Sequence, residues 1–168
     1  MTSQNQPKFR HRVLFVCLGN ICRSPAAEGI FRHLVQSAGL HEHILIDSCG
    51  TGAWHVGDAP DGRMIRHAKD RGYDLSDLEA RQFRAPEDFL EFDLILTMDE
   101  KNLQNVLALD RDQKYKHKVK PLVSFCKIHA VKEVPDPYYR EADGFEYVLD
   151  LIEDAAQELL NHLKDKKP

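Results

Sequence analysis

Short runs of apolar residues alternate with longer segments of helical periodicity along this chain. Valine, leucine, isoleucine and phenylalanine dominate each run, which is typical of strands buried on both faces of a parallel sheet. The fourth run contains Pro121, which lacks the N–H group that a central strand needs, so we place it at a sheet edge. The expected strands cover residues 13–17, 43–47, 92–97 and 118–123.

Between these runs, apolar residues recur every three or four positions and predict helices. The longest stripe runs from Phe145 to Leu163, and Ser24 and Pro25 suit the first turn of another helix. The expected helices cover residues 24–38, 61–71, 85–90, 99–109 and 145–163. Alternating strands and helices predict an α/β fold in three layers, with a parallel sheet flanked by helices on both faces. In such folds, ligands bind beyond the carboxyl ends of the strands.

Length and composition limit the class of protein. A chain of 168 residues, 42% of them apolar, favours one soluble domain, which we assign to residues 12–165 after a flexible tail at residues 1–11. No apolar run reaches the ~18 residues that span a bilayer, and the polar N-terminus lacks the apolar core of a secretory signal. A formal net charge of -4 disfavours general nucleic-acid binding. We therefore expect a cytoplasmic protein that binds neither membrane nor nucleic acid.

The candidates for reactive thiols are Cys17, Cys22, Cys49 and Cys126. In a cytoplasmic chain of this size, cysteines do not suggest a disulfide scaffold, and these four lack the paired spacing of a zinc site. We therefore expect no metal site. Cys49 and Cys126 are expected to be buried thiols, since cysteine is among the most buried residue types.

Cys17 and Arg23 frame a loop with the composition of an anion site. The loop follows an expected strand and precedes an expected helix, whose unpaired N–H groups and dipole favour negative charge. Gly19 permits backbone angles closed to other residues, and Asn20 tolerates the left-handed region. The guanidinium of Arg23 can bind two phosphoryl oxygens at once. The residues expected to bind phosphate are Leu18, Gly19, Asn20, Ile21, Cys22, Arg23 and Ser24.

A cysteine at the floor of such a loop is placed for covalent capture of phosphorus. Nearby cations and helix N-termini favour the thiolate, so we expect Cys17 to be the nucleophile and Ser24 to donate a hydrogen bond to its sulfur. No Gly-Lys-Ser/Thr sequence follows, which separates the loop from nucleotide-binding P-loops. The alternative is a buried core thiol that merely ends a strand.

The segment VLFVCLGNICRSPAAE, at residues 13–28, resembles the low-molecular-weight protein tyrosine phosphatases almost residue for residue. The resemblance extends through TMDE at residues 97–100 and VPDPYY at residues 134–139, and it is strongest to the bacterial, cyanobacterial-like members. It implies a four-stranded parallel sheet and a phosphocysteine intermediate. It also implies phosphotyrosine-containing proteins as substrates, and neither a metal nor another cofactor.

Asp136 lies between two prolines that restrict the backbone on both sides. By spacing alone, an ordinary Asp-Pro turn is the favoured explanation of this segment. The resemblance implies that Asp136 is the general acid that protonates the leaving phenolate, and later the base that activates water. Tyr138, Tyr139 and Trp54 are the expected cleft walls for a phenyl ring, with plain packing as the alternative.

Three further positions bear on the loop. Asp99 can hydrogen-bond to the catalytic loop or cap the helix that follows it, and the two roles are compatible. Leu78 stands where some family members carry a histidine that supports the loop serine, which leaves the support of Ser24 open. The family implies that Cys22 forms a protective disulfide with Cys17 under peroxide, whereas a small packed residue is the plainer interpretation.

Two other functions fit parts of the pattern. Arsenate reductases of the same fold need a further pair of cysteines, and residues 73–105 contain none. A non-catalytic phosphate-binding domain would keep Arg23 but would need neither a nucleophile nor an acid, and candidates for both are present. We therefore expect a phosphatase. We further expect it to be a monomer or a weak homodimer.

Overall fold

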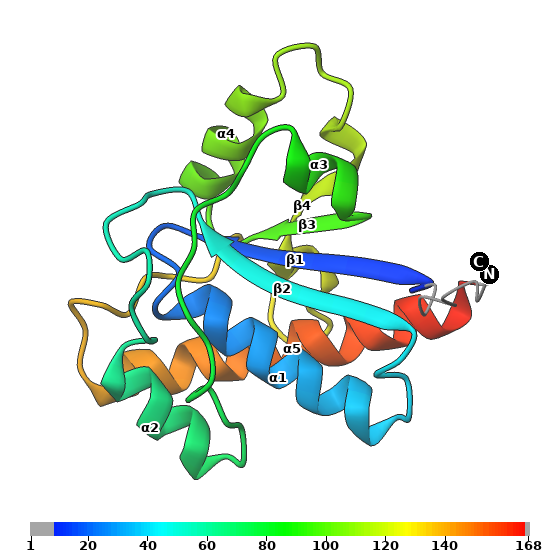
Figure 1. Ribbon diagram of the computed structural model, residues 1–168. Helices are drawn as coiled ribbons and strands as arrows, with labels where there is room; N and C mark the ends of the chain where they lie inside the picture. Colours follow the sequence, from blue (N-terminus) through cyan, green and yellow to red (C-terminus); the bar gives the residue numbers. More distant parts are fainter. Residues whose placement is uncertain (1–8, 167–168) are drawn as a thin grey trace, which may run out of the picture.

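Four parallel strands form the centre of the protein in the computed structural model, which describes residues 9–166 (Figure 1). The strands are β1 His11–Cys17, β2 Ile44–Gly50, β3 Leu94–Thr97 and β4 Val119–Pro121. They are ordered β2-β1-β3-β4, so β4 lies at a sheet edge, as Pro121 predicts. Every paired strand runs parallel to its neighbour, which confirms the expected α/β class.

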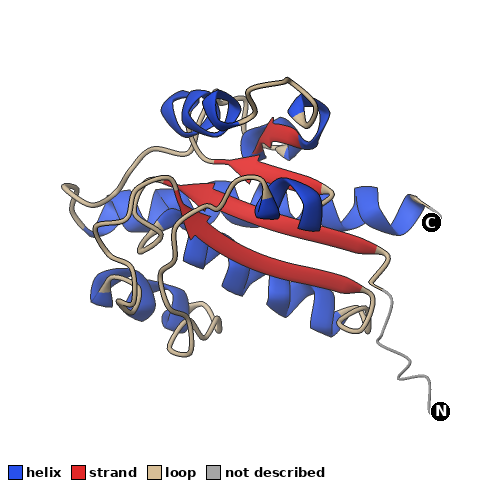
Figure 2. Ribbon diagram, turned by 45° about the horizontal axis from the view of Figure 1, so that its top comes forward, coloured by secondary structure: helices blue, strands red, loops and turns tan. Residues whose placement is uncertain are grey.

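Helices cover both faces of this sheet. They are α1 Arg23–Ser37, α2 Gly62–Asp70, α3 Glu87–Glu91, α4 Glu100–Leu109 and α5 Ala142–Asp165, with 3-10 turns at Lys116–Lys118 and Leu122–Phe125. α1, α2 and α5 lie on one face, and α3 and α4 lie on the other (Figures 1 and 2). The three-layer arrangement expected from the sequence is therefore confirmed. Among the described residues, no helix combines the length and apolarity needed to cross a membrane.

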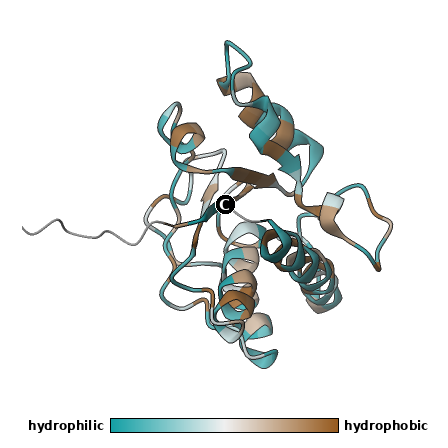
Figure 3. Cartoon of the chain, turned by 90° about the vertical axis from the view of Figure 1, so that its right-hand side faces the viewer, coloured by the Kyte–Doolittle hydropathy of each residue, from teal (hydrophilic) through white to brown (hydrophobic). Residues whose placement is uncertain are grey.

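Strand β1 contributes to two cores because its side chains alternate between the faces of the sheet. Val13, Phe15 and Cys17 face the larger core, which α1 and α5 complete, whereas Leu14 and Val16 face the smaller core beside α3 and α4. All five are at most 3% exposed. In Figure 3, strand segments coloured as hydrophobic lie between helices that carry both hydrophobic and hydrophilic residues. Burial on both faces explains why the sequence of β1 is a continuous apolar run.

The ends of two strands depart from the sequence prediction. β4 stops at Pro121, and the remaining residues of the expected strand begin a 3-10 turn, because proline has no N–H to continue a ladder. β2 continues past its predicted end to Gly50, because its last three residues pair with the end of β1. β1 begins at His11. Residues 1–8 of the expected tail lie outside the described residues.

The order of the strands switches at β1. β2, the next strand in the chain, lies on one side of β1, and β3 lies on the other. A crevice forms beyond the carboxyl end of a strand at such a switch point. Cys17 is the last residue of β1, so the sheet places the following loop, residues 18–22, at this crevice.

Candidate active site

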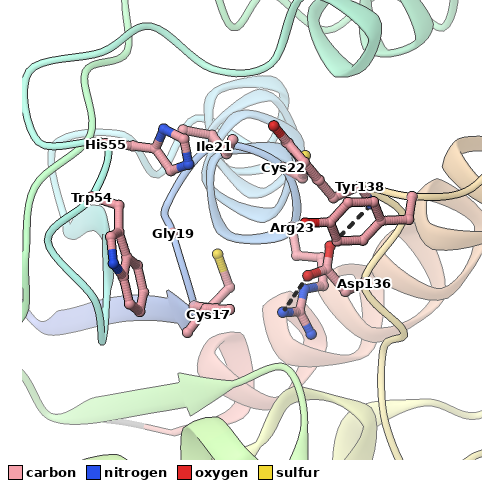
Figure 4. Close-up of a pocket in the computed structure, with 11 residues that line it drawn as sticks. Cys17, Gly19, Ile21, Cys22, Arg23, Trp54, His55, Asp136 and Tyr138 are labelled. Atoms are coloured by element: carbon pink, nitrogen blue, oxygen red, sulfur yellow. Dashed lines mark hydrogen bonds and ion pairs between the residues drawn. The ribbon is translucent and has the colours of Figure 1, made fainter.

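The loop between β1 and α1 forms the base of a cavity of about 210 Å³ (Figure 4). Asn20 takes the left-handed backbone conformation, with φ at 57°. Gly19 does not take that conformation, so the expectation that its backbone freedom is used in the loop is wrong. A Cβ at Gly19 would lie 3.1 Å from His55 Cδ2, which is a tight contact, so a larger residue there would push the imidazole aside. α1 begins at Arg23, which brings the unpaired N–H groups of its first turn to the same loop.

Residues from three parts of the chain line the cavity. They are Cys17, Leu18, Gly19, Ile21, Cys22, Arg23, Trp54, His55, Asp136, Tyr138 and Tyr139. Two residues expected to bind phosphate, Asn20 and Ser24, do not line it; their side chains lie 2% and 0% exposed beneath the loop. The structure therefore brings the nucleophile, the guanidinium, the carboxyl and the aromatic walls expected from the sequence to one place.

Cys17 lies at the floor of this cavity, with its sulfur turned into the open space (Figure 4). The backbone N–H of Asn20 donates to Cys17 Sγ at 3.3 Å, and Ser24 Oγ lies 3.0 Å from the same sulfur. Both groups can stabilise negative charge on sulfur, because a hydrogen bond to the charged form favours that form. The surroundings of Cys17 thus differ from those of an inert core thiol, which has no open space before it.

The hydroxyl of Ser24 is supported by Asn20 and not by the apolar side chain of Leu78. Asn20 Nδ2 donates to Ser24 Oγ at 2.7 Å, whereas Leu78 packs against the larger core. Because Ser24 Oγ accepts this bond, its own proton can point to the sulfur of Cys17 or to the carbonyl of Cys49, 3.3 Å away. The structure therefore answers the question that Leu78 raised about the loop serine.

The amide of Asn20 is itself held on both sides. Its Oδ1 accepts the backbone N–H of Arg81 at 3.0 Å, and its Nδ2 also donates to Ser48 Oγ at 3.0 Å. Ser48 Oγ in turn donates to Glu28 Oε1 at 2.6 Å. Burial raises the pKa of Glu28 above its ordinary value. A buried network with all of these partners satisfied fixes the loop in one conformation.

Arg23 is a buried cation whose partners fix its orientation. Its side chain is 2% exposed, and Nη1 donates to Asp99 Oδ2 at 2.6 Å and to the carbonyl of Val134 at 3.1 Å. Nη2 lies 3.7 Å from Asp136 Oδ2. Burial alone would lower the pKa of Arg23, but Cys17, Asp99 and Asp136 outweigh it, so the pKa is raised. The guanidinium therefore stays charged and oriented at the cavity floor.

Asp99 fills both of the roles expected for it. Its Oδ2 accepts from Arg23, and its Oδ1 accepts the backbone N–H of Asn102 at 2.8 Å. Asn102 Oδ1 accepts from the backbone N–H of Asp99 at 3.1 Å, which completes a capping box at the start of α4. One carboxylate thus ties the second helical layer to the loop.

Asp136 and the aromatic side chains form the rim of the cavity. The Asp136 carboxyl faces Arg23 and is 42% exposed, and its Oδ1 accepts the backbone N–H of Tyr138 at 3.1 Å (Figure 4). Trp54 lies on the other side of the sulfur from Asp136 and Tyr138. Trp54 and Tyr139 are 73% and 94% exposed, so they are not core residues, whereas Tyr138 is 37% exposed. A flat ring can enter between these walls.

Comparison with known proteins identifies the family. Residues 12–168 match the family model described as low molecular weight phosphotyrosine protein phosphatase. The chain belongs to this family. It is 53% identical to a Synechocystis protein named as a low molecular weight protein-tyrosine-phosphatase, over 90% of this chain and 96% of the relative. It is 42% identical to the human low molecular weight phosphotyrosine protein phosphatase, over 81% of this chain and 85% of that one.

Solved structures of the family superpose closely on this one. A protein tyrosine phosphatase from Entamoeba histolytica, crystallised with Hepes in its active site, gives a TM-score of 0.87 at 42% identity, covering 92% of this chain and 97% of that chain. YfkJ from Bacillus subtilis gives a TM-score of 0.87 at 36% identity, covering 94% and 97%. The resemblance inferred from the sequence is confirmed, and this chain is a low-molecular-weight protein-tyrosine-phosphatase.

The other cysteines of this phosphatase differ in their surroundings. Cys22 is 4% exposed and lines the cavity beside Cys17. Burial, then the charges of Asp61 and Cys17, raise the pKa of Cys22, so it stays a neutral thiol. Cys49 is fully buried, as expected, but Cys126 is only half-buried, so its expected burial is wrong. It lies in the loop before α5, where its Sγ reaches the carbonyl of Leu151 at 3.7 Å.

Sequence reasoning missed two features of the site. His55 lines the cavity next to Trp54, with its ring Nδ1 3.2 Å from Asp58 Oδ2. Its position directly after the candidate wall residue was the one available signal. Ser48 and Glu28 carry no motif of their own, and only the register of β2 against β1 brings Ser48 to Asn20.

Proposed function

We propose that this phosphatase hydrolyses phosphotyrosine monoesters of proteins through a phosphocysteine intermediate on Cys17. The observation that supports this most is the geometry around one sulfur. The Cys17 sulfur faces the cavity with an N–H and a hydroxyl within hydrogen-bond distance, and the Arg23 guanidinium lies at the same floor. The Asp136 carboxyl stands at the rim, 3.7 Å from Arg23.

In the first step, the Cys17 thiolate attacks phosphorus. A sulfur–phosphorus bond forms as the bond from phosphorus to the tyrosine oxygen breaks, and protonated Asp136 gives its proton to the departing phenolate. The Arg23 guanidinium and the N–H groups of the loop stabilise the equatorial oxygens, where charge is spread in the transition state. The products of this step are free tyrosine side chain and phosphocysteine.

In the second step, Asp136 acts as the base. Its carboxylate takes a proton from a water molecule, whose oxygen attacks the phosphorus of phosphocysteine. The sulfur–phosphorus bond breaks, inorganic phosphate leaves, and the Cys17 thiolate is regenerated. Ser24 stabilises that leaving thiolate, since its proton can point to the sulfur.

Preorganisation is the main contribution of the fold to this chemistry. Asp99 and Val134 fix Arg23 before any substrate arrives. The buried Asn20 network fixes the loop in the same way. Donors that are already oriented do not need to reorganise as charge develops, which is usually the largest electrostatic contribution to catalysis.

The exposed walls support phosphotyrosine as the substrate class. A phenyl ring that stacks between Trp54 and Tyr138 reaches the cavity floor with its phosphoryl group, whereas the shorter side chain of phosphoserine leaves its phosphoryl group near the rim. The proposed partners are therefore proteins with a phosphotyrosine on an accessible segment.

We also propose that Cys22 protects the nucleophile. Peroxide oxidises the Cys17 thiolate to a sulfenic acid and is reduced to hydroxide. The Cys22 thiol then condenses with that sulfenic acid, and a disulfide and water form. Both residues line one cavity, which supports this pairing, and the proton of the Cys22 thiol leaves with the hydroxyl of the sulfenic acid as water.

Hydrolysis of p-nitrophenyl phosphate and of matched phosphotyrosine and phosphoserine peptides tests the function. We expect turnover of p-nitrophenyl phosphate and of the tyrosine peptide but not of the serine peptide, with complete loss in Cys17→Ser and no loss in the remote control Cys126→Ser. Retained turnover in Cys17→Ser would refute the nucleophile. Phosphate binding without any hydrolysis by the native chain would favour the non-catalytic alternative, and arsenate reduction with thioredoxin would favour the reductase.

A further inference from the structure

Three segments that are far apart in the sequence meet beside the cavity. They are the phosphate-binding loop at residues 18–22, the start of α2 and the segment that carries Asp136. The backbone N–H of Asp61, the N-cap of α2, donates to the carbonyl of Ile21 at 2.8 Å. The start of α2 is therefore tied directly to the phosphate-binding loop.

Arg63 extends from this anchored helix start. Its guanidinium donates from Nε to Asp61 Oδ1 at 3.0 Å and from Nη2 to Asp61 Oδ2 at 2.8 Å. The Asp61 side chain is only 12% exposed. Two parallel bonds between a planar fork and a carboxylate fix both the position and the plane of the guanidinium.

The fixed guanidinium contacts the segment that carries the candidate acid. Arg63 Cζ lies 5.4 Å from the ring centroid of Tyr138 and 4.8 Å from that of Phe145, which belongs to α5. Cation–π contacts form within about 6 Å of a ring centroid. Tyr139 packs edge-on against Tyr138 but is 94% exposed, so it is a weak anchor for the segment.

Tyr138 connects this contact to Asp136. Its backbone N–H donates to Asp136 Oδ1 at 3.1 Å, and this bond sets the direction of the carboxyl group. Any shift of Tyr138 therefore turns the carboxyl that faces Arg23. A continuous path runs from Ile21 through Asp61, Arg63 and Tyr138 to the acid.

We propose that Arg63 is a positioning residue that clips the acid-bearing segment to the phosphate-binding loop and so sets the orientation of Asp136. Arg63 does not line the cavity, and Asp61 occupies its fork, so it is not a ligand of the substrate phosphate. The proposal rests on the proposed role of Asp136 as general acid.

The test compares leaving groups in Arg63→Gln and Arg63→Lys, because kcat/KM reports every step through the departure of the phenol. Phenyl phosphate needs the acid, whereas p-nitrophenolate leaves almost unaided. A small displacement of a catalytic group can cost up to about 100-fold, so we expect about a tenfold fall for phenyl phosphate and less than twofold for p-nitrophenyl phosphate. Lysine keeps the charge but lacks the fork and the plane, so we expect it not to rescue.

Controls separate this proposal from a merely structural role and from the acid itself. Arg66→Gln alters an exposed arginine of the same helix and should change neither rate. In an Asp136→Asn background, Arg63→Gln should add nothing for phenyl phosphate, since both act through one group. Equal losses of kcat/KM for both substrates, or an additive loss in the double variant, would refute the positioning role of Arg63. If Asp136→Asn alone shows no dependence on the leaving group, the acid role fails instead.

Discussion

Replacing Asp99 with asparagine isolates the ion pair that orients Arg23. Asparagine keeps a side-chain oxygen that can accept from the backbone N–H of Asn102, so the cap of α4 survives. The substitution removes the negative charge that lies 2.6 Å from Arg23 Nη1. Arg23 is then left buried with the Val134 carbonyl and the more distant Asp136.

The size of the effect follows from the burial of the pair. Removing one partner of a fully buried ion pair costs about 3–5 kcal/mol, and a hydrogen bond to a charged group contributes about 1.5–3 kcal/mol. Asp99 is 20% exposed, and Arg23 keeps two other partners, so the lower figure applies. We expect a loss of about 2 kcal/mol, which lowers Tm by about 4–8 °C in a domain of this size.

Thermal unfolding followed by circular dichroism measures this loss, with and without saturating inorganic phosphate. The phosphate dianion supplies negative charge to the same guanidinium, so it should narrow the gap between Asp99→Asn and the native chain. Asp99→Ala also removes the cap and should lose about 1 kcal/mol more. A native Tm in Asp99→Asn, or a gap that phosphate leaves unchanged, would show that Asp99 does not hold Arg23.

Three further predictions concern other parts of the chain. Ser24→Ala removes the hydroxyl 3.0 Å from the sulfur, so alkylation of Cys17 by iodoacetamide at about pH 6 should slow several-fold, and an unchanged rate would count against that bond. After brief treatment with peroxide and then with a thiol reductant, the native chain should recover most of its untreated activity, whereas Cys22→Ser should recover little of its own untreated activity. Equal recovery would show that Cys22 does not protect Cys17. Burial alone would raise the pKa of Asp154, but the N–H groups of Lys127, Ile128 and His129 outweigh it and hold the pKa well below its usual value. The contribution of Asp154 to stability is therefore present above the unfolded pKa of about 3.9 and is lost as pH falls below it. Asp154→Ala should lose about 2 kcal/mol of unfolding free energy at pH 7. In acid its unfolding free energy should decline less steeply than that of the native chain, and parallel declines would refute this.

The sequence predicts the sheet well because burial on both faces leaves continuous apolar runs. Val13 to Cys17 is such a run, and the turn residues around it place the loop beside a helix start. The helix at residues 100–109 is equally predictable, because the capping residue Asp99 is local in sequence. Where a proline interrupts the pattern, as at Pro121, the end of the strand depends on pairing that local sequence does not specify.

The contacts that hold the site in shape depend on tertiary register and leave little local signal. Ser48 contacts Asn20 only because β2 pairs with β1 in one register. A slip of one residue would turn Ser48 to the other face of the sheet. The guanidinium of Arg63 contacts the ring of Tyr138, which is far away in the sequence. An arginine on a helix surface has no local sequence pattern that predicts such a contact. The cysteine, the arginine and the acid follow from the family motif, and so do Ser24 and Asp99, but the other residues that orient them do not.

The central claim, that phosphate passes through the sulfur of Cys17, can be tested directly by trapping the intermediate. Native phosphatase mixed with p-nitrophenyl phosphate is quenched in acid within milliseconds, digested and analysed by mass spectrometry. We expect the mass of one phosphoryl group on the peptide that contains Cys17, more of it in Asp136→Ala, which lacks the base for its hydrolysis, and none in Cys17→Ser. A phosphoryl group on any other residue, or turnover with the Cys17 peptide always unmodified, would contradict the account.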